Sequence, residues 1–228
     1  MSTSRFKAII FDLDDTLYPE RQYVLSGFQA VAEWAEQQLG ISQQDAFGRL
    51  RSLFEQGVRN NTFNLFLEEN NLHDDNLITE MIKVYRCHQP SLTPFPDVPD
   101  LLEYLSKNFL LGLISDGYLD VQRKKWNALA LPVVFQAVIF SDQWGREFWK
   151  PSQRPFREAL EQLETTAAAA GYIGDNPKKD FLGAKEIGMY TIMVQRKGGE
   201  YSHLPPPSQS YAADMTVSNL SQLKKIVA

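Results

Sequence analysis

The sequence lacks the features of disulfide-stabilised, exported and membrane-spanning proteins. Its 228 residues include a single cysteine, Cys87, which cannot form a disulfide within the chain. No apolar run approaches the ~20 residues that span a bilayer. Residues 1–7 hold no apolar signal core. We therefore expect a cytoplasmic protein that has no membrane partner.

An excess of positive charge is also absent. Lys and Arg number 23 against 28 for Asp and Glu, which leaves a net charge of −5. Proteins that bind nucleic acid polymers concentrate basic residues on one face, so we expect no such partner. With 43% hydrophobic and 22% charged residues, the chain has an ordinary globular composition. Its length allows one or two domains, and we expect a monomer or a homodimer.

Short apolar runs recur along the chain and are bounded by turn residues. They predict buried parallel strands at residues 6–11, 110–114, 137–140, 170–173 and 190–194, with an edge strand at 215–217. Patterns of helical period separate them, at residues 98–108, 122–131, 155–163, 178–187 and 220–227. Strands that alternate with helices predict an α/β fold built on a doubly wound parallel sheet.

One stretch breaks this alternation. Between residues 19 and 91 the pattern is helical only, with predicted helices at residues 24–39, 42–56, 63–69 and 75–88. We expect an all-helical domain at 19–91, inserted into an α/β core domain formed by 1–18 and 92–228. Phe63 and Phe66 are expected in the core of the inserted domain.

The segment FDLDDTL, residues 11–17, places three carboxylates directly after the first strand. Asp12 and Asp14 share one side of an extended chain, where their repulsion favours a cation between them. An Asp-rich turn or a helix N-cap is the alternative. A calcium-binding EF-hand loop is excluded, because Leu17 stands where the loop needs glycine and Tyr23 where it needs glutamate.

A second acidic segment, GDNPKKD at residues 174–180, also follows a predicted strand. It could cap a helix with its two lysines solvated. Ligands bind at the carboxyl ends of parallel strands, however, so Asp175 can meet Asp12 and Asp14 there and bind magnesium. Ser115 and Lys150 would add a hydroxyl and an ammonium group able to bind a phosphoryl group.

These segments, in this order, resemble the haloacid dehalogenase (HAD) superfamily, and within it the magnesium-dependent phosphohydrolases with a helical cap. The matching parts are FDLDDTLY, LLGLISDG, Lys150 with Pro151, and GYIGDNPKKDFLGAKEIGM. The first and last are specific, whereas the middle two are short. The resemblance implies a Rossmann-like core and a cap formed by residues 19–91.

The resemblance also implies roles for the two aspartates and a metal ion. Asp12 would be the nucleophile that forms an aspartyl phosphate. Asp14 would act as general acid and then as general base. Mg²⁺ would be held by the Asp12 side chain, the Asp14 backbone carbonyl and Asp175.

Other matched positions receive supporting roles. Ser115 and Lys150 would bind phosphate oxygens, and Asp116 and Gly117 would contribute backbone contacts. Thr16 would assist near Asp14, and Asp180 would orient the lysine or metal-bound water from behind.

Two further regions are candidates for the site. Among the polar residues of the inserted domain, Arg86 and His88 lie near the return hinge and are the first candidates for substrate contacts; the others are Arg21, Arg59, Asn60 and Asn61. The segment between Ser141 and Lys150 is longer and more aromatic than is common in the family. Its Trp144, Arg146 and Trp149 either line the mouth of the site or pack.

The predicted function is a phosphatase acting on a small phosphorylated metabolite, such as a nucleoside monophosphate or a sugar phosphate. A phosphosugar mutase uses the same aspartates, so this alternative stays open. A 2-haloacid dehalogenase needs neither a second carboxylate nor magnesium, and Asp14 and Asp175 disfavour it; Asp14 also disfavours a phosphonatase. A noncatalytic phosphate-binding protein would be supported by loss of Asp12 or Asp14, and both are present. A phospho-accepting signalling domain also uses clustered aspartates. Such domains are typically about half this length, so this alternative ranks last.

Overall fold

The computed structural model describes residues 5–201 and 203–227, and the chain forms two compact units. The sheet unit comprises the residues up to Glu20 and from Leu92 onward, and the helical unit comprises Arg21–Ser91. Within the described residues, no helix is both long and apolar enough to cross a membrane.

The sheet unit is built on six parallel strands. They are β1 (Ala8–Phe11), β2 (Leu110–Ser115), β3 (Ala137–Phe140), β4 (Ala170–Gly174), β5 (Tyr190–Val194) and β6 (Met215–Val217), in the order β3-β2-β1-β4-β5-β6. The predicted parallel sheet and its edge strand are confirmed. The order reverses beside β1, which leaves a crevice at the carboxyl ends of β1, β2 and β4.

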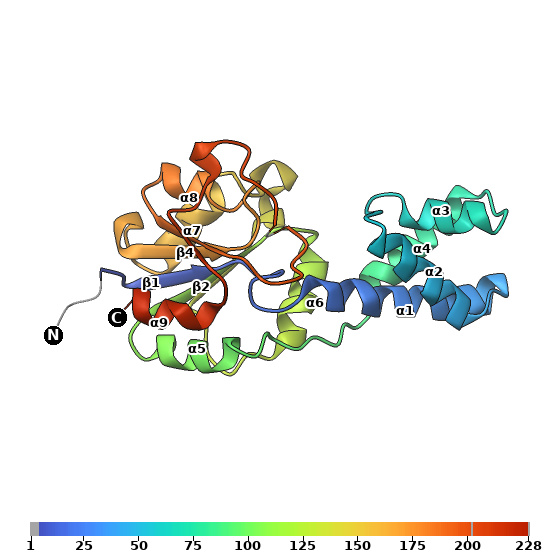
Figure 1. Ribbon diagram of the computed structural model, residues 1–228, viewed down its shortest axis with the longest axis horizontal. Coiled ribbons are helices and arrows are strands. Elements are labelled where there is room, and N and C mark those ends of the chain that lie inside the picture. The colour runs from blue at the N-terminus through green and yellow to red at the C-terminus, as the bar shows by residue number, and fades with distance from the viewer. Residues whose placement is uncertain (1–4, 202, 228) are drawn as a thin grey trace. The chain divides into compact units, whose positions relative to one another are not determined.

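Helices cover both faces of this sheet, as the doubly wound prediction requires (Figure 1). On one side of β1 and β4 lie α7 (Arg154–Gln162) and α8 (Leu182–Glu186), and on the other lie α5 (Val98–Ser106) and α9 (Leu223–Ile226). The helix α6 (Leu119–Leu129) packs against β3. Because both faces are covered, every residue of β1 is buried.

The core under α7 and α8 explains why the strand ends hold their positions. Ala8 and Ile10 of β1 and Tyr172 of β4 point to this side and pack against Phe156 of α7 and Ala184 of α8. The Phe156 and Tyr172 rings meet edge to face, 4.9 Å between centroids. This packing supports the polar residues that follow β1 and β4 with a rigid base.

The helical unit contains α1 (Glu20–Leu39), α2 (Gln43–Glu55), α3 (Thr62–Glu69) and α4 (Asp75–Cys87). Phe28, Leu50 and Phe66 belong to its buried core, so the expectation for Phe66 holds, and the half-buried Phe63 packs against the same core. Helices α1 and α4 approach closely at Gly27, where a Cβ atom would lie 2.5 Å from the Tyr85 ring.

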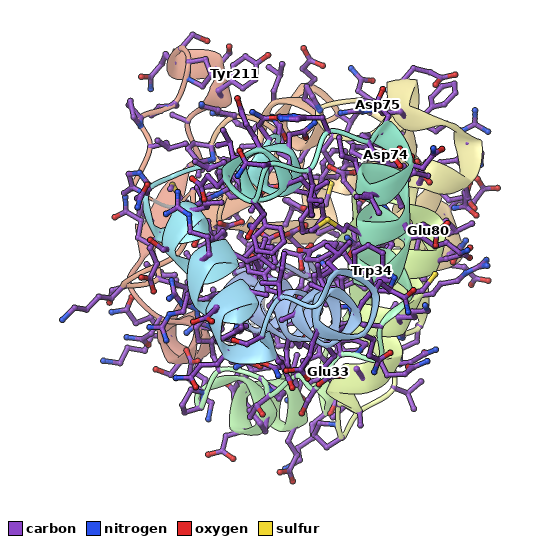
Figure 2. All side chains as sticks on the ribbon, turned by 90° about the vertical axis from the view of Figure 1, so that its right-hand side faces the viewer. Glu33, Trp34, Asp74, Asp75, Glu80 and Tyr211 are labelled. Carbon is purple, nitrogen blue, oxygen red and sulfur yellow. The ribbon has the colours of Figure 1, made fainter. Side chains whose placement is uncertain are left out.

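Polar groups define the ends of the helices in this unit. Ser42 caps α2 by accepting a hydrogen bond from the Asp45 backbone N–H at 3.1 Å. Asp74 caps α4 through the Asn76 N–H at 2.8 Å. Figure 2 shows Asp74 and Asp75 at the start of α4, with Glu80 farther along it. Carboxylates at this end favour the helix because its dipole is positive there.

Two segments differ from the predicted helices and loops. The predicted helix at 178–187 is shorter, because residues 177–179 form a turn and α8 begins only at Leu182. The segment after β3 is folded into two 3₁₀ turns, η1 (Ser141–Trp144) and η2 (Arg146–Phe148). Further 3₁₀ turns are η3 (Ala167–Ala169), η4 (Gln209–Tyr211) and η5 (Leu220–Gln222).

Candidate active site

Three strand ends bring the predicted polar residues to one edge of the sheet. Asp12 follows β1, and its backbone N–H donates to the Ile173 carbonyl of β4 at 2.8 Å, which continues the strand pairing. Ser115 is the last residue of β2, and Asp175 follows β4 directly. All three residues are buried. The order of the strands therefore places these side chains beside one another.

Lys150 lies at the centre of this cluster and is fully enclosed. Its Nζ donates a short hydrogen bond to Asp12 Oδ1 and another to the Tyr172 hydroxyl at 2.9 Å, and it lies 2.8 Å from Asp180 Oδ1. The resemblance implies that Asp180 orients the lysine or metal-bound water, and in the structure Asp180 contacts Lys150 directly. The Tyr172 hydroxyl is an additional contact that the sequence does not predict.

The enclosure changes the acid–base behaviour of Asp12 and Lys150. Burial raises the pKa of Asp12 to about 7, although the ammonium of Lys150 acts in the opposite direction. Burial alone would lower the pKa of Lys150, but the charges of Asp12 and Asp180 outweigh it and raise that pKa. Lys150 therefore stays a cation wherever Asp12 is ionised.

The cluster of Asp12, Asp175 and Asp180 fits a divalent cation. One oxygen from each of these buried carboxylates lies within 4.8 Å of the others. Asp175 Oδ2 is buried and has no hydrogen-bond partner among the described residues. Burial, together with the charges of Asp180 and Asp12, raises the pKa of Asp175 well above its usual value. Hard carboxylate oxygens that repel one another are suited to Mg²⁺.

Within this cluster Asp180 is held by the protein itself. Its Oδ2 accepts hydrogen bonds from the backbone N–H groups of Asp175 at 3.1 Å and Asn176 at 2.8 Å. The chain passes so close that a Cβ atom at Gly174 would lie 2.5 Å from Asp180 Oδ2. Asp180 thus fixes both the turn after β4 and the position of Lys150, which agrees with a supporting role.

The side chain of Asp14 has different partners from that of Asp12. It accepts hydrogen bonds from Lys125 Nζ at 2.8 and 2.9 Å, and a short one from the Tyr18 hydroxyl. Burial would by itself raise the pKa of Asp14. The charge and hydrogen bonds of Lys125, together with the hydrogen bond from Tyr18, outweigh burial and lower this pKa. Neither Lys125 nor Tyr18 is among the site residues predicted from the sequence.

The segment after β2 carries the predicted phosphate-binding residues. The Ser115 hydroxyl donates to Gln122 Oε1 at 2.9 Å. Gly117 has φ of 125°, and a Cβ atom there would meet Gln122 Nε2 at 2.5 Å, so glycine is needed at this turn. The Asp116 side chain accepts hydrogen bonds from the Ser141 hydroxyl and from the Lys150 backbone N–H at 3.1 Å. Asp116 therefore ties this turn to the lysine segment.

Thr16 and Asp15 are buried in the turn that follows Asp14. The Thr16 hydroxyl is buried and has no hydrogen-bond partner within residues 5–201 and 203–227. Its carbonyl accepts from Arg196 Nη2 at 3.1 Å. Asp15, at φ of 51°, accepts hydrogen bonds from the backbone N–H groups of Glu20 and Glu200, both at 2.8 Å, which fix the turn after Asp14.

A cavity of about 330 Å³ opens at this edge of the sheet unit. The residues that line it are Asp12, Asp14, Glu20, Asp116, Gly117, Gln122, Trp149, Lys150, Asp175, Asn176, Lys179 and Tyr201. Among the aromatic residues of the 141–149 segment, Trp149 lines the cavity, whereas Trp144 packs against the core under α7 and α8. Arg146 lies over the Trp149 ring, 5.1 Å from its centroid.

A further cation, Lys179, faces the same cavity, although one interpretation of the sequence leaves it in solvent. Its Nζ lies 3.4 Å from Asp116 Oδ2, with 31% of the side chain exposed. Burial lowers its pKa and Lys150 lowers it further, but Asp116, Asp12 and Asp180 outweigh both and raise it.

Glu20 adds a carboxyl group to the lining of this cavity, and it too is absent from the site residues predicted from the sequence. Burial and the nearby Asp14 raise the pKa of Glu20 to about 8.

The predicted substrate contacts of the inserted domain, Arg86 and His88, lie in the helical unit. His88 Nε2 is 2.8 Å from the Ser26 hydroxyl, and its Nδ1 is 2.6 Å from the Tyr85 carbonyl. Both ring nitrogens thus have partners inside that unit, and His88 also ends α4 through its backbone N–H. Substrate contact by Arg86 or His88 stays a prediction.

Comparison with known proteins gives a consistent family. The model of the family described as haloacid dehalogenase-like hydrolase matches residues 9–194. A glyceraldehyde 3-phosphate phosphatase from Methanothermobacter thermautotrophicus is 31% identical over 97% of this chain and 99% of its own length.

Solved structures of the same architecture include enzymes of two activities. A HAD phosphatase from Thermococcus onnurineus is 25% identical, with a TM-score of 0.61 over 98% of each chain. A 2-haloacid dehalogenase from Pseudomonas syringae is 29% identical, with a TM-score of 0.61 over 97% of each chain. The choice between these activities therefore depends on the side chains of the site.

Proposed function

Because the chain belongs to the haloacid dehalogenase-like hydrolase family, we propose that it is a phosphatase that hydrolyses small phosphate monoesters. The observation that carries the proposal is the cluster of Asp12, Lys150, Asp175 and Asp180, with Asp14 two residues after the nucleophile. A cavity of about 330 Å³ is at the small end of ligand pockets, which suits a phosphorylated metabolite such as a sugar phosphate.

In the first half of the reaction Asp12 acts as the nucleophile. One of its carboxylate oxygens forms a bond to phosphorus while the bond from phosphorus to the ester oxygen breaks. Asp14 gives a proton to that leaving oxygen, and the alcohol departs. Lys150 holds Asp12 in place, since its Nζ contacts both Asp12 and the fixed carboxylate of Asp180.

In the second half a water molecule hydrolyses the aspartyl phosphate. Asp14, now ionised, takes a proton from this water as the water attacks phosphorus, and inorganic phosphate leaves. Ser115, Lys150 and the backbone of Asp116 and Gly117 stabilise the charge on the phosphoryl oxygens. Asp12, the Asp14 carbonyl and Asp175 would hold Mg²⁺, which supplies positive charge to offset the repulsion between the carboxylate and the phosphate.

The dehalogenase activity is the second candidate, because a structural relative has it. A halide ion leaves without a proton, so a dehalogenase has no use for a proton donor at Asp14. It likewise has no use for a buried carboxylate, Asp175, whose Oδ2 has no hydrogen-bond partner among the described residues. These two residues favour the phosphatase. The helical unit is proposed as the cap that selects the leaving group.

A panel of phosphate esters, assayed with Mg²⁺ and with a chelator, tests this function. We expect Mg²⁺-dependent release of inorganic phosphate from at least one sugar phosphate or nucleoside monophosphate, and no release by Asp12→Asn. Conversion of a sugar phosphate to an isomer without phosphate release would indicate a mutase instead. Halide release from a 2-haloacid, independent of Mg²⁺, would indicate a dehalogenase. No reaction with any substrate, or equal activity of wild type and Asp12→Asn, would refute the proposal.

A further inference from the structure

Lys125 is a cation beside Asp14, and the phosphatase mechanism proposed above gives it no role. It is located on α6, is 3% exposed, and its Nζ lies 2.8 Å from Asp14 Oδ1 and 2.9 Å from Asp14 Oδ2. The Glu20 carboxylate is 3.9 Å away. Lys125 is therefore directed at the carboxyl group of Asp14 through both of its oxygens.

The surroundings of this contact restrict the orientation of Asp14. The Tyr18 hydroxyl donates to the same Oδ1 that Lys125 contacts, so two donors hold one oxygen. Gln122, one turn before Lys125 on α6, accepts the hydrogen bond of the Ser115 hydroxyl. Residues three apart share a helix face, so α6 directs one side chain to the phosphate-binding hydroxyl and the next to Asp14.

A role in stability alone explains this arrangement poorly. Removing an ammonium group from water costs several kcal/mol, and its attraction to Asp14 and the more distant Glu20 repays that cost only with excellent geometry. A buried apolar residue at this position of α6 would avoid the cost. A group that exchanges protons, however, benefits from a partner that fixes its orientation and stabilises the charge that it acquires on losing a proton.

We propose that Lys125 is a positioning residue that holds the carboxyl group of Asp14 in the orientation from which Asp14 serves the leaving oxygen. This inference rests on the proposed phosphatase function. In the step concerned, the bond from phosphorus to the ester oxygen breaks while Asp12 bonds to phosphorus. The ester oxygen takes the proton of Asp14, and Lys125 stabilises the carboxylate that is left. Lys125 does not itself contact the phosphate.

A double-variant cycle on the ester hydrolysed fastest in the panel is the decisive test. We expect Lys125→Met to lower kcat/KM by ~10²-fold, within the range for loss of general acid catalysis. In an Asp14→Asn background the same substitution should change kcat/KM by less than about twofold, because the group through which Lys125 acts is gone. Effects that multiply would mean that Lys125 acts on the substrate directly, and would overturn the proposal.

The identity of the leaving group provides a second readout that a structural role would not affect. Nitrophenolate leaves without a proton, whereas phenolate, a poorer leaving group, gains more from one. Lys125→Met should therefore lower kcat/KM more for phenyl phosphate than for p-nitrophenyl phosphate, by about tenfold or more. An equal loss for both esters would contradict a role through the general acid.

Two further variants separate positioning from folding. Arg123→Met removes a cation from the exposed face of the same helix and should leave kcat/KM unchanged. Lys125→Arg keeps a cationic donor and should retain part of the activity that Lys125→Met loses. If thermal melting shows that Lys125→Met is unfolded, Lys125→Arg takes its place in the double-variant cycle. A wild type that releases no phosphate refutes both the function and this inference, whereas an active wild type with unaffected Lys125 variants refutes only the inference.

Discussion

Asp12 and Asp14 are two residues apart in the sequence and have opposite environments. The pKa of Asp12 is raised to about 7 by burial, against the opposing charge of Lys150. The pKa of Asp14 is lowered, because Lys125 and Tyr18 outweigh its burial. Environments that move two carboxyl pKa values apart are the usual basis for different acid–base roles. In the metal-free protein both shifts run opposite to the proposed roles, because a nucleophile must be ionised and a general acid must carry a proton.

The division of roles predicts how Asp14→Asn behaves. The substitution keeps the backbone carbonyl, which is the proposed metal ligand, and removes only the side chain bound to Lys125 and Tyr18. We expect turnover to fall by ~10²–10⁴-fold, while Mg²⁺ affinity, measured by isothermal titration calorimetry, stays at the wild-type value. Asp175→Asn is the matched control and should weaken both. A parallel loss of Mg²⁺ affinity and turnover in Asp14→Asn would contradict the assignment.

At the scale of elements, the sequence predicts the part of the site that lies at the ends of the strands. Apolar runs followed by Asp12, Ser115 and Asp175 indicate parallel strands with polar carboxyl ends, and the structure brings these residues together. The sequence predicts neither the contact of Lys125 with Asp14 nor the position of Lys179 at the cavity, because these residues lie on a helix and a turn whose rotation depends on tertiary packing. No local pattern distinguishes them from solvated lysines.

Helix α8 begins later than the sequence predicts, for a related reason. Residues 178–187 have a helical pattern, yet the Asp180 carboxylate accepts hydrogen bonds from the backbone N–H groups of Asp175 and Asn176. This local bonding competes with helix formation and delays the start of α8 to Leu182. The strand order was not predicted either, because the short runs carry no signal that selects their neighbours.

The junction of α8 with the lysine segment predicts a coupled loss of stability and activity. A Cβ atom at Gly183 would lie 2.2 Å from the Pro151 carbonyl oxygen, so Gly183→Ala must displace backbone next to Lys150. We expect a destabilisation of ~1–3 kcal/mol and a lower kcat. Gly48→Ala in α2 is the control, since among the described residues no atom beyond its chain neighbours and the backbone of its own helix lies within 4 Å of its Cβ position; it should be neutral or stabilise by ~0.5–1 kcal/mol. Chemical denaturation measures both, and an unaffected Gly183→Ala would refute the clash.

For the whole molecule, the net charge of −5 conceals an uneven distribution. Five of the residues that line the cavity are carboxylates, and they face the ammonium groups of Lys150 and Lys179. An acidic chain can therefore present a field that accepts a phosphate, provided that a divalent cation joins the carboxylates. The helical unit has its own hydrophobic core. Its action as a cap and a cytoplasmic location stay predictions.

The concentration of carboxylates predicts how stability depends on pH. In the folded protein without metal, Asp12 and Glu20 keep their protons up to about pH 7 and pH 8. In the unfolded chain they ionise at their ordinary pKa values of 3.8 and 4.5. Between about pH 5 and about pH 8 the folded state thus binds more protons than the unfolded state, so stability falls as pH rises. Differential scanning calorimetry in a chelator should show a lower Tm at the higher pH.

Magnesium should reverse part of this loss. The cation binds ionised carboxylates of the folded state, so it should raise Tm more at about pH 8 than at about pH 5, where protons compete for Asp12 and Asp175. Glu20→Gln should reduce the fall of Tm with pH and leave the response to Mg²⁺ in place, because Glu20 lies outside the cluster of Asp12, Asp175 and Asp180. A metal-free Tm that rises from about pH 5 to about pH 8 would show that these carboxyl groups are already ionised in the folded protein.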